Sequence, residues 1–132
     1  MSDVKFQGQV ALVTGASRGI GAAIALELAT QGLKVVGTAT TEDGAAKISA
    51  ALAGFADCRG AKLDVNDAGA GEALIDEITK AHGALHVLVN NAGITRDTLA
   101  MRLKDDDWDA VLDTNLKAVF RMSRAVIRPM MK

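Results

Sequence analysis

The sequence predicts an α/β protein: a doubly wound parallel sheet with helices on both faces, in three α/β/α layers. Short apolar segments alternate four times with longer amphipathic ones, which is the pattern of parallel strands joined by crossover helices. The first apolar segment, residues 10–14, lies between Gly8 and Gly15 and shows no polar alternation. Such a run is typical of a strand buried on both faces. In folds of this class, ligands bind at the carboxyl ends of the strands.

The expected elements follow one another without a composition break. Strands are expected at residues 10–14, 33–38, 61–65 and 85–89, and helices at 20–31, 44–53, 68–82 and from about 104 onward. Gly32 and Gly83 directly follow two of the helices and act as C-cap signals. The apolar helix faces are predicted to be Ile20, Ile24 and Leu28, then Ala45, Ile48 and Leu52, then Leu74, Ile75 and Ile78. Proline at position 129 should kink or end the last helix.

The composition is that of a globular domain without strong affinity for polyanions. The chain has 132 residues, 49% hydrophobic and 23% charged, with a net charge of −1. This charge argues against binding to nucleic acid or to an anionic membrane. The single cysteine, Cys58, fits a reducing compartment, and no apolar run approaches the roughly 20 residues of a membrane span. The first residues do not resemble a secretory signal, so we expect a cytoplasmic protein with no nucleic-acid or membrane partner.

A glycine-rich turn follows the first strand, in the run Thr14-Gly15-Ala16-Ser17-Arg18-Gly19-Ile20-Gly21. A tight turn favours residues without a Cβ, and the pyrophosphate of a dinucleotide must approach bare backbone. The phosphates would then meet the N–H groups and the positive end of the next helix. The alternative is a turn that only lets the helix pack on the strand, but its position after a buried strand favours a nucleotide. We therefore expect cofactor contacts from Gly15, Ala16, Ser17, Arg18, Gly19, Ile20 and Gly21.

The glycine spacing is G-x-x-x-G-x-G, not the G-x-G-x-x-G of the common dinucleotide fingerprint. With the preceding Thr, it resembles the short-chain dehydrogenase/reductase family, whose fold is Rossmann-like. The resemblance implies that residues 1–132 form one NAD(P)-binding Rossmann domain, incomplete at its C-terminal end. The fold would be truncated after the fourth strand and the following helix. The sheet order would then be 3-2-1-4, with residues 85–89 forming an apolar edge of the kind that favours aggregation.

Two other strand ends carry the same resemblance. In the family, an Asp after the third strand binds the adenine amino group and the next backbone N–H meets the ring, which implies these roles for Asp64 and Val65. A lone Asp at this position would otherwise be interpreted as an N-cap or a turn residue. Asn90-Asn91-Ala92-Gly93 matches a family motif that stabilises the sheet and lines the nicotinamide-ribose side of the cleft. The resemblance thus adds Asn91, Ala92 and Gly93 to the cofactor contacts.

The predicted cofactor is NADPH rather than NADH. An NAD-binding site usually has an acidic residue at the end of the second strand, whereas this end is neutral and contains Thr38 and Thr40. We expect both threonines to contact the cofactor. Arg18 in the glycine turn can supply the cation that a 2′-phosphate requires, although a solvated surface arginine is the alternative. Glu42 lies about 20 residues beyond Gly21, at the spacing of an NAD-binding carboxylate, but several residues past the strand.

The last predicted helix carries two polar features. Asn115 lies on its apolar face, where an unbonded amide would cost about 1 to 3 kcal/mol. The resemblance implies a catalytic-site role in which the Asn115 carbonyl holds a water of the proton relay; a core amide bonded to backbone is the alternative. Basic residues also recur along one face, which is either a solvated surface or a docking surface for an acidic partner. This basic stripe consists of Lys117, Arg121, Arg124, Arg128 and Lys132.

Within the family, residues 15–21, 37–40, 90–97 and 104–108 are most similar to bacterial 3-oxoacyl-[acyl-carrier-protein] reductases. The similarity implies NADPH-dependent reduction of 3-oxoacyl groups on acyl carrier protein, during fatty acid synthesis, by a homotetramer. The catalytic Ser, Tyr and Lys of the family are absent from this sequence: they follow the fifth strand, and the chain contains no Tyr. Ser123 belongs to the preceding helix and cannot replace the family's Ser. We therefore expect the 132-residue chain alone to be inactive and unstable. A non-catalytic NADP-binding module and an inactive truncation product remain the alternatives.

Overall fold

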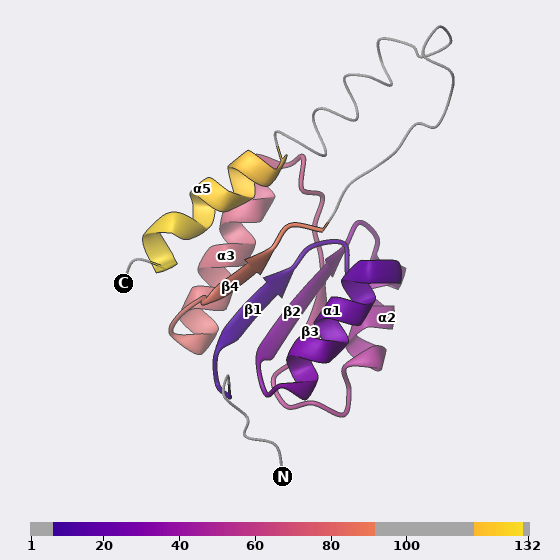
Figure 1. The fold of residues 1–132 in the computed structure, drawn as a ribbon. Coiled ribbons are helices and arrows are strands. Elements are labelled where there is room, and N and C mark those ends of the chain that lie inside the picture. The colour runs from indigo at the N-terminus through magenta and orange to yellow at the C-terminus, as the bar shows by residue number, and fades with distance from the viewer. Residues whose placement is uncertain (1–6, 92–117, 131–132) are drawn as a thin grey trace, which may run out of the picture.

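The computed structural model describes residues 7–91 and 118–130. The strands are β1 (Val10–Val13), β2 (Lys34–Ala39), β3 (Arg59–Lys62) and β4 (Val87–Val89), and the helices are α1 (Gly19–Thr30), α2 (Glu42–Ala51), α3 (Ala68–His82) and α5 (Ala118–Met130). Strand and helix alternate as predicted, and the sheet lies between two helical layers (Figure 1).

The four described strands form one parallel sheet in the order β3-β2-β1-β4, which confirms the predicted order. The register aligns Val13 of β1 with Gly37 of β2 on one side and with Val89 of β4 on the other. The segments that follow these strands therefore meet at one edge of the sheet. This edge is the one where the sequence predicts ligand binding.

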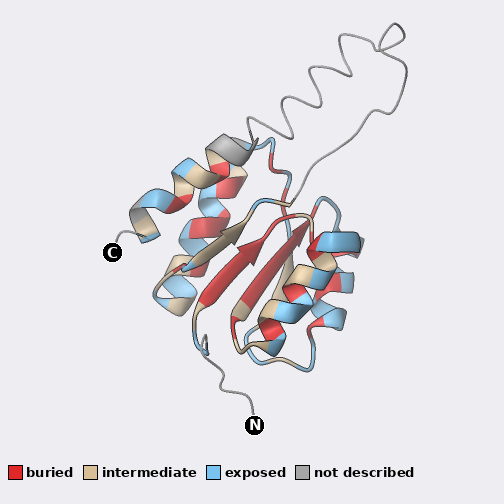
Figure 2. Cartoon of the chain, in the orientation of Figure 1, coloured by how far each residue is buried: buried red, intermediate tan, exposed pale blue. Residues whose placement is uncertain are grey.

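Each face of the sheet is covered by its own hydrophobic cluster, as period-two alternation along a strand requires. Val10 and Leu12 of β1 belong to the cluster that includes α3 and α5, and Ala11 and Val13 belong to the cluster that includes α1 and α2. All four are completely buried, and β1 and β2 form the most deeply buried part of the molecule in Figure 2. The central strands thus read as continuous apolar runs because both of their faces are covered.

The buried face of α1 differs from the prediction. Gly21, Ala25 and Ala29 face the sheet, whereas Ile20 is 74% exposed and Ile24 is only partly buried. Small residues on the inner face let the helix axis approach the strands closely. The prediction was therefore wrong for Ile20, whereas Ile24 and Leu28 pack against the core from partly buried positions. The predicted apolar faces of α2 and α3 are confirmed.

The helix ends follow the local capping signals. Helix α3 has the bounds that the sequence predicts, because the Asp67 side chain caps its N-terminus and Gly83 adopts a left-handed φ of 82° at its C-terminus. The described part of helix α5 extends to Met130 and includes Pro129. Lys104 and the rest of the predicted start of this last helix lie outside the described residues.

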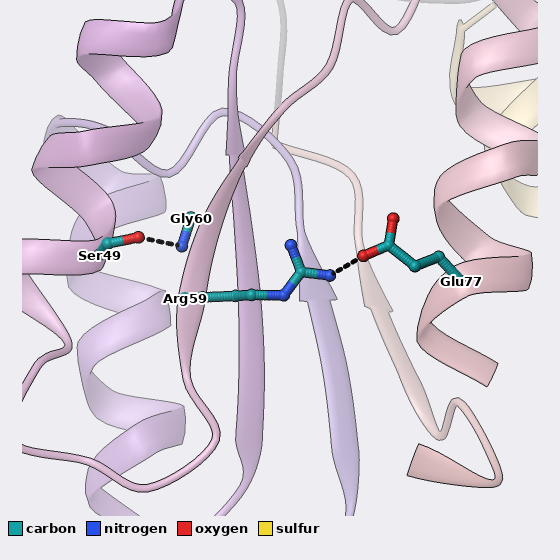
Figure 3. A network of polar contacts seen from close by, with 4 residues as sticks. All are labelled: Ser49, Arg59, Gly60 and Glu77. Atoms are coloured by element: carbon teal, nitrogen blue, oxygen red, sulfur yellow. Dashed lines mark hydrogen bonds and ion pairs between the residues drawn. The ribbon is translucent and has the colours of Figure 1, made fainter. Parts of the chain in front are cut away.

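The edge strand β3 begins two residues earlier than predicted and is tied to a helix on each side. The backbone N–H of Gly60 donates to the hydroxyl of Ser49 on α2 at 2.9 Å, and Arg59 forms an ion pair with Glu77 on α3 at 2.7 Å (Figure 3). Cys58 precedes the strand: its sulfur accepts from the backbone N–H of Val35 and donates to the carbonyl of Leu33. These bonds give the lone cysteine a structural role at the start of β3.

None of the helices within residues 7–91 and 118–130 is long and apolar enough to cross a membrane. In the same two segments, no cluster of His, Cys, Asp and Glu side chains could hold a metal ion.

Candidate functional site

The glycine turn (residues 15–21) connects β1 to α1 at the carboxyl edge of the sheet. Gly15 has φ of 64° and Gly19 has φ of 63°, both in the left-handed region that residues with a Cβ avoid. A Cβ added at Gly19 would meet no described atom within 4 Å. Any residue with a Cβ would therefore adopt a strained backbone conformation at position 19. The space beside Gly19 is open to an approaching ligand.

Side chains from three strand ends fix the glycine turn. The Thr14 hydroxyl accepts the backbone N–H of Asn91 at 3.0 Å, and the Asn91 side-chain amide donates to the Gly15 carbonyl at 3.0 Å. On the other side, the backbone N–H of Gly15 donates to the Thr38 hydroxyl at 3.4 Å, and that of Ala16 donates to the Thr38 carbonyl at 2.8 Å. The turn is thereby held between β2 and β4 by hydrogen bonds from within the protein.

Gly21 makes the packing of α1 on this network possible. A Cβ at this position would overlap the Gly15 carbonyl oxygen and the Nδ2 atom of Asn91. No larger residue fits without moving the turn, because two of the three nearest atoms belong to the backbone. Gly21, the third glycine of the motif, is thus needed for close packing of α1, and Gly19, the second, leaves the backbone accessible to a ligand.

The N-terminus of α1 has free backbone donors directed at this edge. Its N-cap residue is Arg18, and no described side chain caps the helix. Helices α2 and α3 differ, because Thr41 accepts from the backbone N–H of Gly44 and Asp67 accepts from that of Ala70, each at 3.0 Å. The first turn of α1 also contains no acidic residue. An uncapped helix N-terminus with open space before it is suited to binding an anion.

The end of β2 shows which of its hydroxyl groups a ligand can reach. Thr38 is buried, and its hydroxyl contacts the glycine turn, whereas Thr40 is exposed just beyond the strand. Thr38 therefore shapes the site through Gly15, and Thr40 has the position for direct contact. Glu42 is the exposed first residue of α2, three residues past the end of β2.

The segment after β3 forms a compact turn at the same edge. The backbone N–H of Leu63 donates to the Ala39 carbonyl at 2.8 Å, so pairing with β2 continues one residue beyond β3. Asp64 follows and is exposed; its Oδ1 accepts the backbone N–H of Asn66 at 2.9 Å. Val65 is buried in the core. The bond to Asn66 is the Asx-turn alternative for Asp64, and it leaves the second carboxylate oxygen available.

Three predicted residues, Ala92, Gly93 and Asn115, lie outside the described part of the chain. Of the motif that begins at Asn90, the structure describes two residues: Asn91 braces the glycine turn, and the Asn90 amide donates to the Ser123 hydroxyl of α5 at 3.3 Å. In the basic stripe, Arg121 donates to the Asn66 carbonyl at 3.0 Å and Arg124 is exposed. The bracing roles of Thr14 and Thr38 were missed because they depend on strand register.

The comparisons with known proteins agree with this geometry. The pattern of the family described as short chain dehydrogenase matches residues 9–132. The chain belongs to this family. It is 53% identical over 129 residues to a protein of Salmonella typhimurium named 3-oxoacyl-[acyl-carrier-protein] reductase, covering 98% of this chain and 52% of that protein. The protein of the same name from Vibrio harveyi is 52% identical over the same shares of the two chains.

A solved structure shows the same fold. A protein of Sinorhizobium meliloti 1021, described as a short-chain alcohol dehydrogenase, superposes with a TM-score of 0.88 at 36% sequence identity. The match covers 96% of this chain and 51% of the other. The chain therefore spans about half the length of the family members it matches, and its residues correspond to their N-terminal half.

Proposed function

We propose that the chain binds NADPH at the carboxyl edge of its sheet and forms the cofactor-binding part of a reductase. The reductase would convert 3-oxoacyl groups on acyl carrier protein to 3-hydroxyacyl groups in fatty acid synthesis, in the cytoplasm. The observation that carries the proposal is the uncapped N-terminus of α1, which begins at the open position Gly19 in a chain of the short chain dehydrogenase family. Free backbone donors and the positive helix end suit a pyrophosphate.

We place the parts of a dinucleotide along this edge. The turn between Gly15 and Gly21 would hold the pyrophosphate, with Asp64 and the backbone of Val65 at the adenine and Asn91 on the nicotinamide side. These groups follow β1, β3 and β4, which lie in one parallel sheet, so they share one edge. When bound, NADPH would supply the hydride; the chain's own residues bind and orient it.

The preference for NADPH over NADH rests on charge. Arg18 is exposed at the N-cap of α1, and Thr40 is exposed beyond β2. Neither residue has a carboxylate, which would repel a 2′-phosphate. The guanidinium of Arg18 suits the geometry of a phosphate. Glu42 begins α2 beyond the strand end, outside the position of an NAD-binding carboxylate.

The substrate class and the assembly come from the relatives. Proteins named 3-oxoacyl-[acyl-carrier-protein] reductase share about half of their residues with this chain across nearly its whole length. We extend to this protein the acyl-carrier-protein substrate, the homotetramer and the role of Asn115 in holding a relay water. The 132 residues contain no Tyr to protonate the carbonyl oxygen, so we propose that this chain alone does not turn over substrate.

Titration of the 132-residue chain with NADPH and, in parallel, with NADH tests the proposal. Dihydronicotinamide fluorescence reports binding of both, and we expect tighter binding of NADPH. A Gly19→Asp variant should lose binding, because a carboxylate would face the phosphates while Asp tolerates a left-handed φ better than most residues. Equal affinity for the two cofactors would refute the NADPH preference. Absence of binding to either, by a sample whose circular dichroism shows the folded helices, would refute the cofactor site, and measurable 3-oxoacyl turnover would refute the proposed inactivity.

A further inference from the structure

Lys47 of α2 faces the glycine turn across a cavity. The cavity has a volume of about 230 Å³ and lies between α1 and α2. Ala16 and Ser17 of the glycine turn line it together with Lys47, and residues of both helices form the remaining wall. One lysine side chain is thus placed beside the predicted phosphate-binding turn without belonging to its sequence motif.

The first turn of α2 packs directly against the glycine turn, which sets the direction of Lys47. A Cβ at Gly44 would lie 3.7 Å from the Cβ of Ser17. Lys47 is three residues after Gly44, so the two positions share a face of the helix. Side chains of a helix lean toward its N-terminus, and Gly44 has no side chain to obstruct that path. A Lys47 side chain in this orientation would carry its ammonium group back along α2 toward Ser17, with which it lines the cavity.

The charge of Lys47 is not neutralised in the described part of the chain. The residue is exposed and forms no ion pair there. Asp43 lies one turn before it, at the spacing of a helical ion pair, yet no bond joins the two. Glu42 and Asp43 are the acidic residues of the first turn of α2, and both are exposed. Arg18 provides the other cation near this corner, at the N-cap of α1.

We propose that Lys47 is a second cation for the 2′-phosphate of NADPH, acting beside Arg18 and raising selectivity over NADH. This inference rests on the proposed cofactor site. Arg18 and Lys47 belong to different helices, so together they would face the phosphate from two sides. Arg18 alone would face it from one side. Asp43 opposes this effect, since it offers Lys47 a competing partner within the helix.

The test compares charge-removing variants by their dissociation constants for NADPH and NADH, at low ionic strength. Lys47→Gln should weaken NADPH binding about two- to fivefold and leave NADH binding unchanged, the range expected for a solvent-exposed ion pair. Asp43→Asn should shift NADPH binding in the opposite direction. Lys80→Gln is the matched control: Lys80 is an exposed lysine of α3, on the other face of the sheet (Figure 1). The difference between the variants should shrink at high salt.

The outcomes separate the two proposals. Unchanged NADPH binding in Lys47→Gln, or an equal loss for NADPH and NADH, would overturn the role of Lys47 and leave the cofactor site intact. The same loss in Lys80→Gln would also overturn it, because a general charge effect would then explain the result. If the unaltered chain retains its helices and binds neither dinucleotide, both the cofactor site and the role of Lys47 are wrong. Far-ultraviolet circular dichroism of each variant verifies that its helices are retained.

Discussion

Gly21→Ala should destabilise the fold, although alanine is the better helix former. In an exposed helix interior, replacing Gly by Ala stabilises by about 1 kcal/mol. At Gly21 the new Cβ would overlap the Gly15 carbonyl oxygen and the side-chain nitrogen of Asn91. The 3.0 Å bond between these two atoms would then have to lengthen or break. The structural clash therefore opposes the propensity gain.

The expected magnitude follows from adding these effects. Overpacking in a well-packed region costs about 1 to 3 kcal/mol, and a lost hydrogen bond costs about 1 kcal/mol more. Subtracting the gain of about 1 kcal/mol from helix propensity leaves a net loss of roughly 1 to 3 kcal/mol. At this chain length, such a loss corresponds to a fall in melting temperature of roughly 3 to 12 °C. Cofactor binding should weaken in parallel, because the same atoms fix the glycine turn.

Thermal unfolding monitored by circular dichroism gives the measurement, with Gly69→Ala as the control. Gly69 is an exposed residue of the first turn of α3, and a Cβ there meets only the Asp67 carboxylate, at 3.6 Å. This variant should gain about 0.5 to 1 kcal/mol. Opposite signs for the two substitutions are the decisive result. If Gly21→Ala melts at or above the unaltered chain, the close packing of α1 on the glycine turn is wrong.

Two further substitutions test separate contacts. Thr14→Val keeps the approximate volume of the side chain but removes the hydroxyl that accepts from the backbone N–H of Asn91, so that this N–H keeps only the Val89 carbonyl at 3.2 Å. We expect a loss of about 0.5 to 1.5 kcal/mol in urea unfolding, and an unchanged midpoint would contradict the bracing role of the hydroxyl. Glu77→Gln removes the ion pair with Arg59; the Glu77 side chain is 62% exposed and that of Arg59 is 39% exposed. The loss of unfolding free energy should therefore stay below about 1 kcal/mol and vanish in 1 M salt. A larger, salt-independent loss would show that this contact contributes more than an exposed pair.

The order and type of the elements could be predicted because strong local signals mark them. Helix α3 lies between an aspartate N-cap and a left-handed glycine, and its predicted bounds are confirmed. Strand β3 was placed two residues too late because Leu63 and Val65, which made its apolar pattern, follow the strand and pack into the core. The strand itself, Arg59-Gly60-Ala61-Lys62, is partly exposed at an edge and therefore carries no apolar run.

The orientation of α1 could not be obtained from periodicity. Its sequence is apolar almost all round, with Glu27 as its one charged residue, so no single face stands out. Residue size decides instead: Gly21, Ala25 and Ala29 allow the closest approach to the strands, and Ile20 and Leu26 remain exposed. A hydrophobic pattern identifies a helix, but it does not identify the buried face when both faces are apolar.

The bracing of the candidate site depends on register, which the sequence does not specify. The strand order brings β2 and β4 next to β1, but only the alignment of Val13 with Gly37 and Val89 places Thr14 within bonding distance of Asn91. A shift of one residue would turn Thr38 to the other face of the sheet and remove its bond to Gly15. The sequence could therefore identify the motif residues as candidate ligands, whereas the contacts that hold these residues in place follow only from the packed sheet.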